Sequence, residues 1–94
     1  MRESKIEEDL CIWAKSQGII VIKIATRGGA QRGVPDRVFL KDGKLCFIEM
    51  KRPGETPEPL QEWWLEKLCT EGFHATYCDD IDRGREYLRG VFGL

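Results

Sequence analysis

GVPDRVFLKDGKLCFIEMKR, residues 33–52, decides the fold of this chain, because it carries the pattern of a tight β-hairpin. Asp42 and Gly43 are the preferred pair for a two-residue turn in which both central residues have positive φ. The flanking runs, residues 36–40 and 45–50, are rich in Val, Phe, Leu and Ile, as strands usually are. The stretch therefore predicts two antiparallel strands joined at Asp42-Gly43.

The register of this hairpin brings two carboxylates together. If the turn consists of those two residues, Asp36 faces Glu49, and Lys51 projects from the same sheet face as Glu49. Directly opposed Cβ atoms lie roughly 4.5–5.5 Å apart, and like charges placed there repel. A shared proton, a salt bridge to Lys51 or a divalent cation between the two carboxylates would each offset the repulsion.

We favour the divalent cation. Two carboxylates and water suit Mg²⁺ or Mn²⁺, which prefer oxygen ligands and keep part of their hydration shell. The competing interpretation is a set of unrelated charged residues on an exposed hairpin surface. The other residues of that face are apolar, however: Val38, Leu40, Leu45 and Phe47. Charges at one end of an apolar face therefore predict a site.

Length and composition indicate one small soluble domain over residues 1–94. The chain is 41% hydrophobic and 33% charged, and no apolar run approaches the roughly 18 residues of a membrane span. We therefore expect a cytoplasmic protein with no membrane partner. The four cysteines occur singly, without the paired spacing of zinc sites, so we expect reduced core residues.

Charge is unevenly distributed along the chain. Residues 23–52 contain eight basic and three acidic side chains, whereas residues 55–94 contain four and nine. A positive patch around the hairpin suits a phosphate backbone. Guanidinium groups on the glycine-rich loop before the hairpin would contact phosphate oxygens, although a plain solvent-exposed loop explains them equally well. The predicted DNA-binding residues are Arg27, Arg32, Arg37 and Arg52.

Periodicity, capping residues and prolines predict the remaining elements. The fold class is α/β, with a single mixed sheet flanked by helices. The predicted order is a helix over residues 5–17, a strand over 19–25, the hairpin, a helix over 59–71, a strand over 73–78 and a helix from a cap at Asp79 or Asp80 to Gly90.

Three details of these elements are also predicted. Ser4 and Glu7 have the spacing of a capping box at the start of the first helix. The strand over 19–25 is almost continuously apolar, which is typical of a strand buried on both faces. The second helix has an apolar stripe at Leu60, Trp63, Trp64 and Leu68; its adjacent tryptophans point about 100° apart, so we expect one in the core and one at a partner interface.

With the elements in this order, the chain resembles the PD-(D/E)XK nuclease superfamily. The resemblance rests on GVPD at 33–36 and IEMK at 48–51. The GVPD form, the ExK strand and Gln61 look most like the VRR-NUC family of virus-type replication-repair nucleases. The resemblance covers almost the whole chain and implies a stand-alone phage-type nuclease domain, with an αβββαβ restriction-endonuclease-like core followed by a C-terminal helix.

The resemblance implies roles for the residues of the hairpin. Asp36 and Glu49 would ligate the metal, with the backbone carbonyl of Met50 as a further ligand. Lys51 would orient or help deprotonate the attacking water and balance charge on the phosphate.

Two helical residues complete the implied site. Glu7 matches the acidic helix residue of related Holliday-junction resolvases, with Glu8 as the alternative, although a capping role also explains Glu7. Gln61 would support the site, or is simply a polar residue of a first helical turn. His74 is expected to have no catalytic role.

The expected function is a Mg²⁺- or Mn²⁺-dependent endonuclease acting on structured DNA, with four-way junctions as the expected substrate and without a small-molecule cofactor. Paired cuts at a junction by a domain with one site predict a homodimer. A flap or nicking nuclease of phage replication and a non-catalytic DNA-binding module of the same fold are the alternatives. The expected dimer interface combines an exposed tryptophan with the apolar C-terminal residues Tyr87, Leu88, Val91, Phe92 and Leu94.

Overall fold

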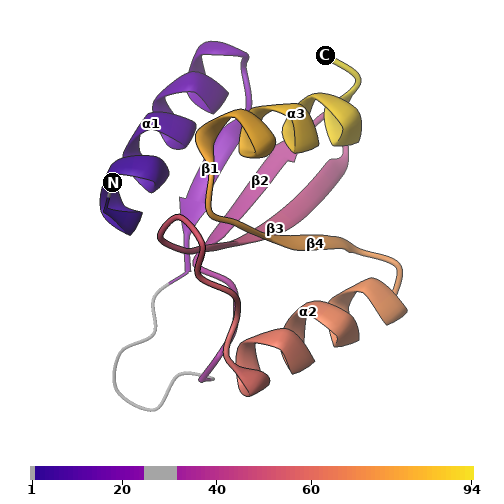
Figure 1. Ribbon diagram of the computed structural model, residues 1–94. Helices are drawn as coiled ribbons and strands as arrows, with labels where there is room; N and C mark the ends of the chain where they lie inside the picture. The colour runs from indigo at the N-terminus through magenta and orange to yellow at the C-terminus, as the bar shows by residue number, and fades with distance from the viewer. Residues whose placement is uncertain (1, 25–31) are drawn as a thin grey trace.

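The computed structural model describes residues 2–24 and 32–94, and within them it confirms the predicted fold class. One mixed sheet has the strand order β1-β2-β3-β4 and is flanked by three helices (Figure 1). None of the helices in these two segments is long and apolar enough to cross a membrane. In chain order the elements are α1 (Glu3–Ser16), β1 (Ile20–Lys23), β2 (Arg37–Lys41), β3 (Lys44–Met50), α2 (Pro59–Thr70), β4 (His74–Cys78) and α3 (Ile81–Phe92).

The central hairpin has the predicted turn and register. Asp42 and Gly43 both adopt positive φ, 52° and 78°. Across the ladder Val38 pairs with Phe47, which is the register expected from a two-residue turn. Strand β1 adds to β2 in an antiparallel manner, whereas β4 runs parallel to β3. The hairpin therefore forms the centre of the sheet.

Helices α1 and α3 cover one face of the sheet, and α2 lies on the other side, against β4 (Figure 1). Period-two alternation in β2 and β3 directs one set of side chains toward α1 and α3. These side chains and those on the inner faces of the two helices are buried together, because removing apolar surface from water stabilises the packed layers. The main members of this core are Ile6, Leu10, Ala14, Phe39, Cys46, Ile48, Met50, Leu88 and Phe92.

The C-terminal apolar segment is part of this core, which corrects the prediction that it forms a dimer interface. Leu88 is fully buried and Phe92 is 6% exposed, because the apolar face of α3 packs onto the sheet and α1. Tyr87 and Val91 also pack against the core. Leu94 remains exposed at the end of the chain.

Strand β1 lies at the sheet edge, so the prediction that it is buried on both faces is wrong. Ile20 is 60% exposed and Ile22 is 49% exposed. Directly opposed residues share a sheet face, so these side chains lie on the face of Leu40 and Val38, their partners in β2. An apolar run indicates a strand but does not say whether a helix will cover it.

The apolar stripe predicted for α2 is also wrong in part. Leu65 is the buried residue of α2, while Leu60 and Trp63 are about half exposed. Among the strands, the helix packs mainly against the edge strand β4, so much of its surface stays exposed. Cys11, Cys46 and Cys78 are buried, as predicted. Cys69 is exposed, because the sheet leaves much of the surface of α2 uncovered.

Candidate functional site

Asp36 lies at the entrance to β2, where backbone hydrogen bonds fix its position. Its carbonyl accepts a 2.8 Å hydrogen bond from the N–H of Ile24, which continues the β1–β2 ladder by one pair. Its side-chain Oδ2 accepts a 2.8 Å hydrogen bond from the N–H of Met50 at the end of β3. The N–H and C=O of one residue in a strand leave the same side, so we expect the Met50 carbonyl to face this edge too.

Glu49 is an unusual residue for a β-strand, since its carboxylate is buried. It is 4% exposed, and its Oε2 accepts a 3.0 Å hydrogen bond from Gln61 Nε2. The other oxygen, Oε1, has no hydrogen-bond partner within the described chain. Burial and the neighbouring Asp36 raise the pKa of Glu49 to about 8, and burial also raises the pKa of Asp36. A cation placed between these two acids would relieve both effects.

Gln61 reaches Glu49 because the amide is held at both ends. Its Oε1 accepts a 2.9 Å hydrogen bond from the N–H of Glu58, which precedes the first turn of α2, so its NH₂ group must point toward Glu49. The start of α2 is itself pressed against the GVPD turn. Gly33 has φ 82°, and a Cβ there would lie 2.8 Å from Cγ of Leu60. Glycine at this position therefore lets α2 deliver Gln61 to the site.

Lys51 follows Glu49 on the same face of β3 and is 8% exposed. Its N–H donates a 2.8 Å hydrogen bond to the carbonyl of Cys78, which adds a last rung to the β3–β4 ladder. The positive charge of Lys51 lowers the pKa of Glu49, although burial and Asp36 outweigh it. The structure therefore brings Asp36, Glu49, Lys51 and Gln61 together at one end of the sheet.

Glu7 is not part of a capping box. Helix α1 begins at Glu3 after an N-cap at Arg2, and no side chain caps it. Glu7 instead forms a 2.6 Å ion pair with Arg37 and lies 3.9 Å from Lys23. Its charge helps to raise the pKa of Asp36, so it lies near the site while its own carboxylate is already paired.

Glu3 is an acid near the site that sequence reasoning missed. It stands one helical turn before Glu7, at the first position of α1. Partial burial and the charge of Asp36 raise its pKa, while Lys51 lowers it. The i, i+4 spacing of Glu3 and Glu7 places both on one helix face and was the available signal. The capping-box interpretation concealed it, because a helix starting after Ser4 leaves Glu3 outside.

The four predicted DNA-binding arginines have different environments. Arg27 lies outside the described residues. Arg32 is exposed, and its carbonyl accepts a 2.9 Å hydrogen bond from the indole of Trp64. Arg37 is engaged by Glu7, and Arg52 by Glu55 at 3.1 Å. Of the three predicted arginines that lie within the described residues, Arg32 is thus the one without an ion pair there.

A cavity of about 300 Å³ opens onto the buried acids. Its wall combines the GVPD turn, the end of β3 and the start of α2, so three segments distant in the sequence meet around it. The lining residues are Arg32, Gly33, Val34, Asp36, Glu49 and Gln61. A phosphate group entering this cavity would meet an arginine on one side and the acid pair on the other.

The donor set fits a hard divalent cation that keeps part of its water shell. Within residues 2–24 and 32–94, no three acidic, histidine or cysteine side chains converge to enclose an ion by themselves. Mg²⁺ is commonly held by one or two carboxylates, with waters and substrate oxygens completing the octahedron. The buried, unpartnered Oε1 of Glu49 is the oxygen that such an ion would use.

Comparison with known proteins places this arrangement in a family. Residues 1–74 match the family model described as archaeal Holliday junction resolvase (Hjc). The chain belongs to the Hjc family. It is also 45% identical over 83 residues to a protein named "Putative nuclease p44" from Acyrthosiphon pisum secondary endosymbiont phage 1, with 87% of each chain covered.

Solved structures similar to this Hjc-family chain confirm the expected resemblance to VRR-NUC domains. One, titled VRR_NUC domain protein, has a TM-score of 0.85 at 21% identity and covers 100% of this chain and 90% of its own. Another, titled VRR_NUC domain, has a TM-score of 0.81 at 20% identity, covering 96% and 97%. At these identities the similarity establishes the fold.

Proposed function

We propose that this Hjc-family protein is a Mg²⁺- or Mn²⁺-dependent endonuclease that cuts four-way DNA junctions as a homodimer. The observation that carries the proposal is the buried Asp36–Glu49 pair beside the buried Lys51. A side-chain hydrogen bond between the two acids adds to the raised pKa of Glu49, and its Oε1 has no other hydrogen-bond partner among the described residues. An unpaired buried carboxylate is costly, so a site that keeps one is suited to a cation.

Each residue then has a chemical role. The carboxylates of Asp36 and Glu49 and the carbonyl of Met50 would hold the ion, which supplies a more acidic water and polarises the scissile phosphate. Gln61 keeps the Glu49 carboxylate oriented through its 3.0 Å hydrogen bond. Lys51 places positive charge where negative charge develops on the phosphate oxygens.

The acid on α1 is assigned to Glu3 and not to Glu7. Glu7 is held by Arg37 at 2.6 Å, and that pair fixes α1 against β2. Glu3 is not in any ion pair among the described residues, and Asp36 and Lys51 both act on its pKa. We therefore assign to Glu3 the role of binding a metal-bound water at the site, with Glu7 as the residue that anchors the helix.

Phosphate recognition is assigned first to Arg32 at the mouth of the cavity. Arg52 is the second candidate, because its pair with Glu55 is exposed and contributes little stability, so a phosphate can compete for it. Contacts of this kind position the DNA backbone without reading bases. Selectivity for junctions then comes from the spacing of two sites in a dimer.

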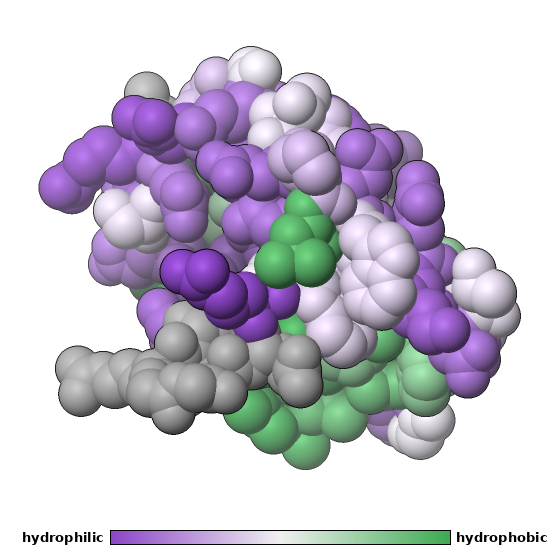
Figure 2. All heavy atoms as spheres, turned by 90° about the horizontal axis from the view of Figure 1, so that it is seen from below, coloured by the Kyte–Doolittle hydropathy of each residue, from purple (hydrophilic) through white to green (hydrophobic). Residues whose placement is uncertain are grey.

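The exposed face of the sheet is the surface we assign to the dimer. Below the sheet, hydrophobic side chains gather on the molecular surface (Figure 2). The open face of β1 and β2 extends to β3, because directly opposed residues of neighbouring strands lie on the same face of the sheet. A large exposed apolar patch marks an interaction site. The apolar patch on this open face consists of Ile20, Ile22, Val38, Leu40, Leu45, Phe47 and Phe73. Trp63 of α2 is also exposed.

Ile22→Glu is expected to weaken the dimer at least about tenfold, because it puts a charge into the apolar interface. Sedimentation equilibrium measures the association, and a junction with both strands labelled reports whether cuts remain paired. Single nicks should replace paired cuts. Ile12→Glu is the matched control, since Ile12 is 61% exposed on α1 and lies on the other side of the sheet. Unchanged association in the Ile22 variant would place the interface elsewhere.

Cleavage of defined DNA substrates tests the function itself. Purified protein is incubated with labelled four-way junctions, flaps and plain duplex, each with Mg²⁺, Mn²⁺ or EDTA. Symmetric metal-dependent cuts on junctions are expected. Preference for flaps or single nicks would favour the replication nuclease instead. Binding that survives EDTA, without cutting under either metal, would favour a non-catalytic DNA-binding module.

A further inference from the structure

The segment that follows Lys51 is a tight turn held at several points. The N–H of Glu55 donates a 2.9 Å hydrogen bond to the carbonyl of Arg52, and Gly54 between them has φ 82°. With Pro53 at the second position, this is the pattern of a type II turn. Arg52 and Glu55 also pair through their side chains at 3.1 Å. The turn is thus well formed, but these contacts are all internal to it.

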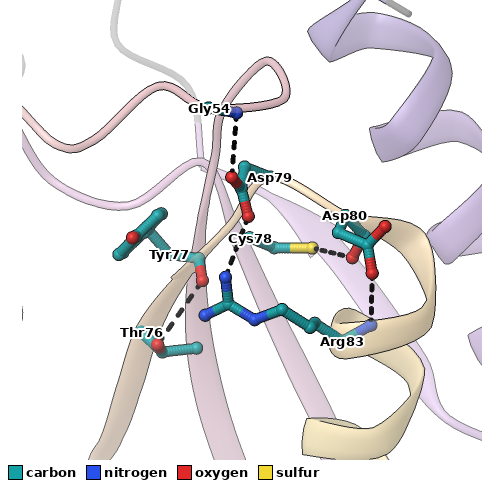
Figure 3. Close-up of polar contacts among 7 residues, drawn as sticks. All are labelled: Gly54, Thr76, Tyr77, Cys78, Asp79, Asp80 and Arg83. Carbon is teal, nitrogen blue, oxygen red and sulfur yellow. Dashed lines mark hydrogen bonds and ion pairs between the residues drawn. The ribbon is translucent and has the colours of Figure 1, made fainter.

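Asp79 is the side chain that ties this turn to the rest of the fold. Its Oδ2 accepts a 3.0 Å hydrogen bond from the N–H of Gly54, across 25 positions of sequence. Its Oδ1 accepts a 3.0 Å hydrogen bond from Arg83 in the first turn of α3. Figure 3 shows the carboxylate between the Gly54 nitrogen above and the Arg83 guanidinium below. Both oxygens are therefore used, and the side chain is only 16% exposed.

Arg83, the ion-pair partner of Asp79, has two further contacts. Arg83 is placed over the Tyr77 ring, with its guanidinium carbon 5.7 Å from the ring centroid. The backbone N–H of Arg83 donates a 3.0 Å hydrogen bond to the side chain of Asp80, the N-cap of α3. The Arg83 side chain is 60% exposed, so these contacts favour its position beside Asp79 without locking it.

Cys78 and Asp79, at the end of β4, therefore hold the segment that follows Glu49 at two points, Lys51 and Gly54. The carbonyl of Cys78 accepts from the N–H of Lys51 at 2.8 Å, and Asp79 accepts from Gly54. We propose that Asp79 is a positioning residue for Lys51: by anchoring the turn over residues 52–55 to β4 and α3, it keeps the Lys51 backbone, and so its ammonium, in register with Glu49. This inference rests on the proposed function.

The test compares three variants under conditions where each is folded, as checked by thermal melting. Asp79→Ala removes both hydrogen bonds, and we expect kcat on junction DNA to fall roughly ten- to a hundredfold with KM unchanged, since small displacements of a catalytic group have effects of that size. Asp79→Asn keeps an oxygen acceptor for Gly54 but turns an NH₂ group toward Arg83, so kcat should recover in part, to a value between those of Asp79→Ala and wild type. Asp82→Ala, at an exposed neighbouring position, is the charge-matched control and should leave kcat unchanged.

Hydrogen exchange gives a readout that is independent of cleavage. The amides of Lys51 and Gly54 should exchange faster in Asp79→Ala, but not in Asp82→Ala. Equal exchange and equal kcat in the Asp79→Ala variant and wild type would overturn the inference, as would a matched fall in kcat for Asp79→Ala and Asp79→Asn. If wild-type protein cuts no DNA with any metal while exchange at Gly54 responds as expected, the proposed function fails and Asp79 is only a structural anchor.

Discussion

Replacing Glu49 with glutamine is expected to abolish cleavage and, in the absence of metal, to stabilise the protein. The two results share one cause. The buried carboxylate that would ligate the ion is also the group that repels Asp36 and lacks a partner for Oε1. Cleavage should fall at least about a thousandfold, since several kcal/mol of transition-state stabilisation are lost with the ion. Single-turnover assays on junction DNA measure that loss.

The stability effect depends on pH in a defined direction. The folded-state pKa of Glu49 is raised from 4.5 to about 8, so between those values the native state holds a proton that the unfolded chain has released. The free energy of unfolding of the metal-free wild type therefore falls as pH rises from about 4.5 to 8. Glu49→Gln removes the contribution of Glu49 to this dependence. In EDTA at pH 8 it should be more stable than wild type by about 1–3 kcal/mol.

Urea unfolding in EDTA at pH 5 and pH 8 measures this difference. Glu66→Gln is the matched control, because Glu66 is exposed on α2 and its replacement should change stability little at either pH. Addition of Mg²⁺ should stabilise the wild type but not the Glu49 variant. A Glu49→Gln protein that is less stable than wild type in EDTA at pH 8 would mean that the carboxylate is satisfied without an ion.

Replacing Lys51 is expected to separate catalysis from binding. The ammonium contributes only where charge develops on the phosphate, so Lys51→Met should lower kcat by about a hundred- to a thousandfold. Methionine retains an unbranched apolar stem for this buried position, which limits the effect on packing. The dissociation constant for junction DNA should stay within about threefold, because Arg32 and the rest of the basic surface remain.

Gel-shift titration in Ca²⁺ or EDTA measures binding, and single-turnover cleavage in Mg²⁺ measures chemistry. Lys44→Met is the matched control. Lys44 is exposed at the start of the same strand, so its replacement removes the same charge far from the acids. Full activity in the Lys51 variant would remove its assigned role. Equal losses of binding in both lysine variants would show that the two act only through net positive charge.

The centre of the fold was readable from local sequence. Asp42-Gly43 requires a turn with two positive φ values, and that turn fixes the pairing of every residue in the hairpin. The opposition of Asp36 and Glu49 follows from this register, because side-chain direction in a strand alternates strictly. Gln61 could be expected near the site only through the family resemblance, since its approach depends on how α2 packs.

The errors arose where burial depends on distant segments. Ile20 and Ile22 were expected inside, but the sheet ends at β1 and α2 packs against β4, so their face is open. Leu88 and Phe92 were expected at an interface, but α3 closes the core with them. Apolar periodicity predicts that a face of an element is buried. It does not predict whether that face packs against the same chain or against another.

The sequence by itself determined the hairpin, its register and the facing acids, because turn chemistry and strand alternation act over a few neighbouring residues. Only the tertiary structure decided the environment of those acids. The packing of α1 against the sheet brings Glu3 near enough for the charge of Asp36 to raise its pKa, and it pairs Glu7 with Arg37. The packing of α2 and β4 buries Glu49 and anchors the turn after Lys51. Such contacts join residues far apart along the chain, and no local pattern encodes them.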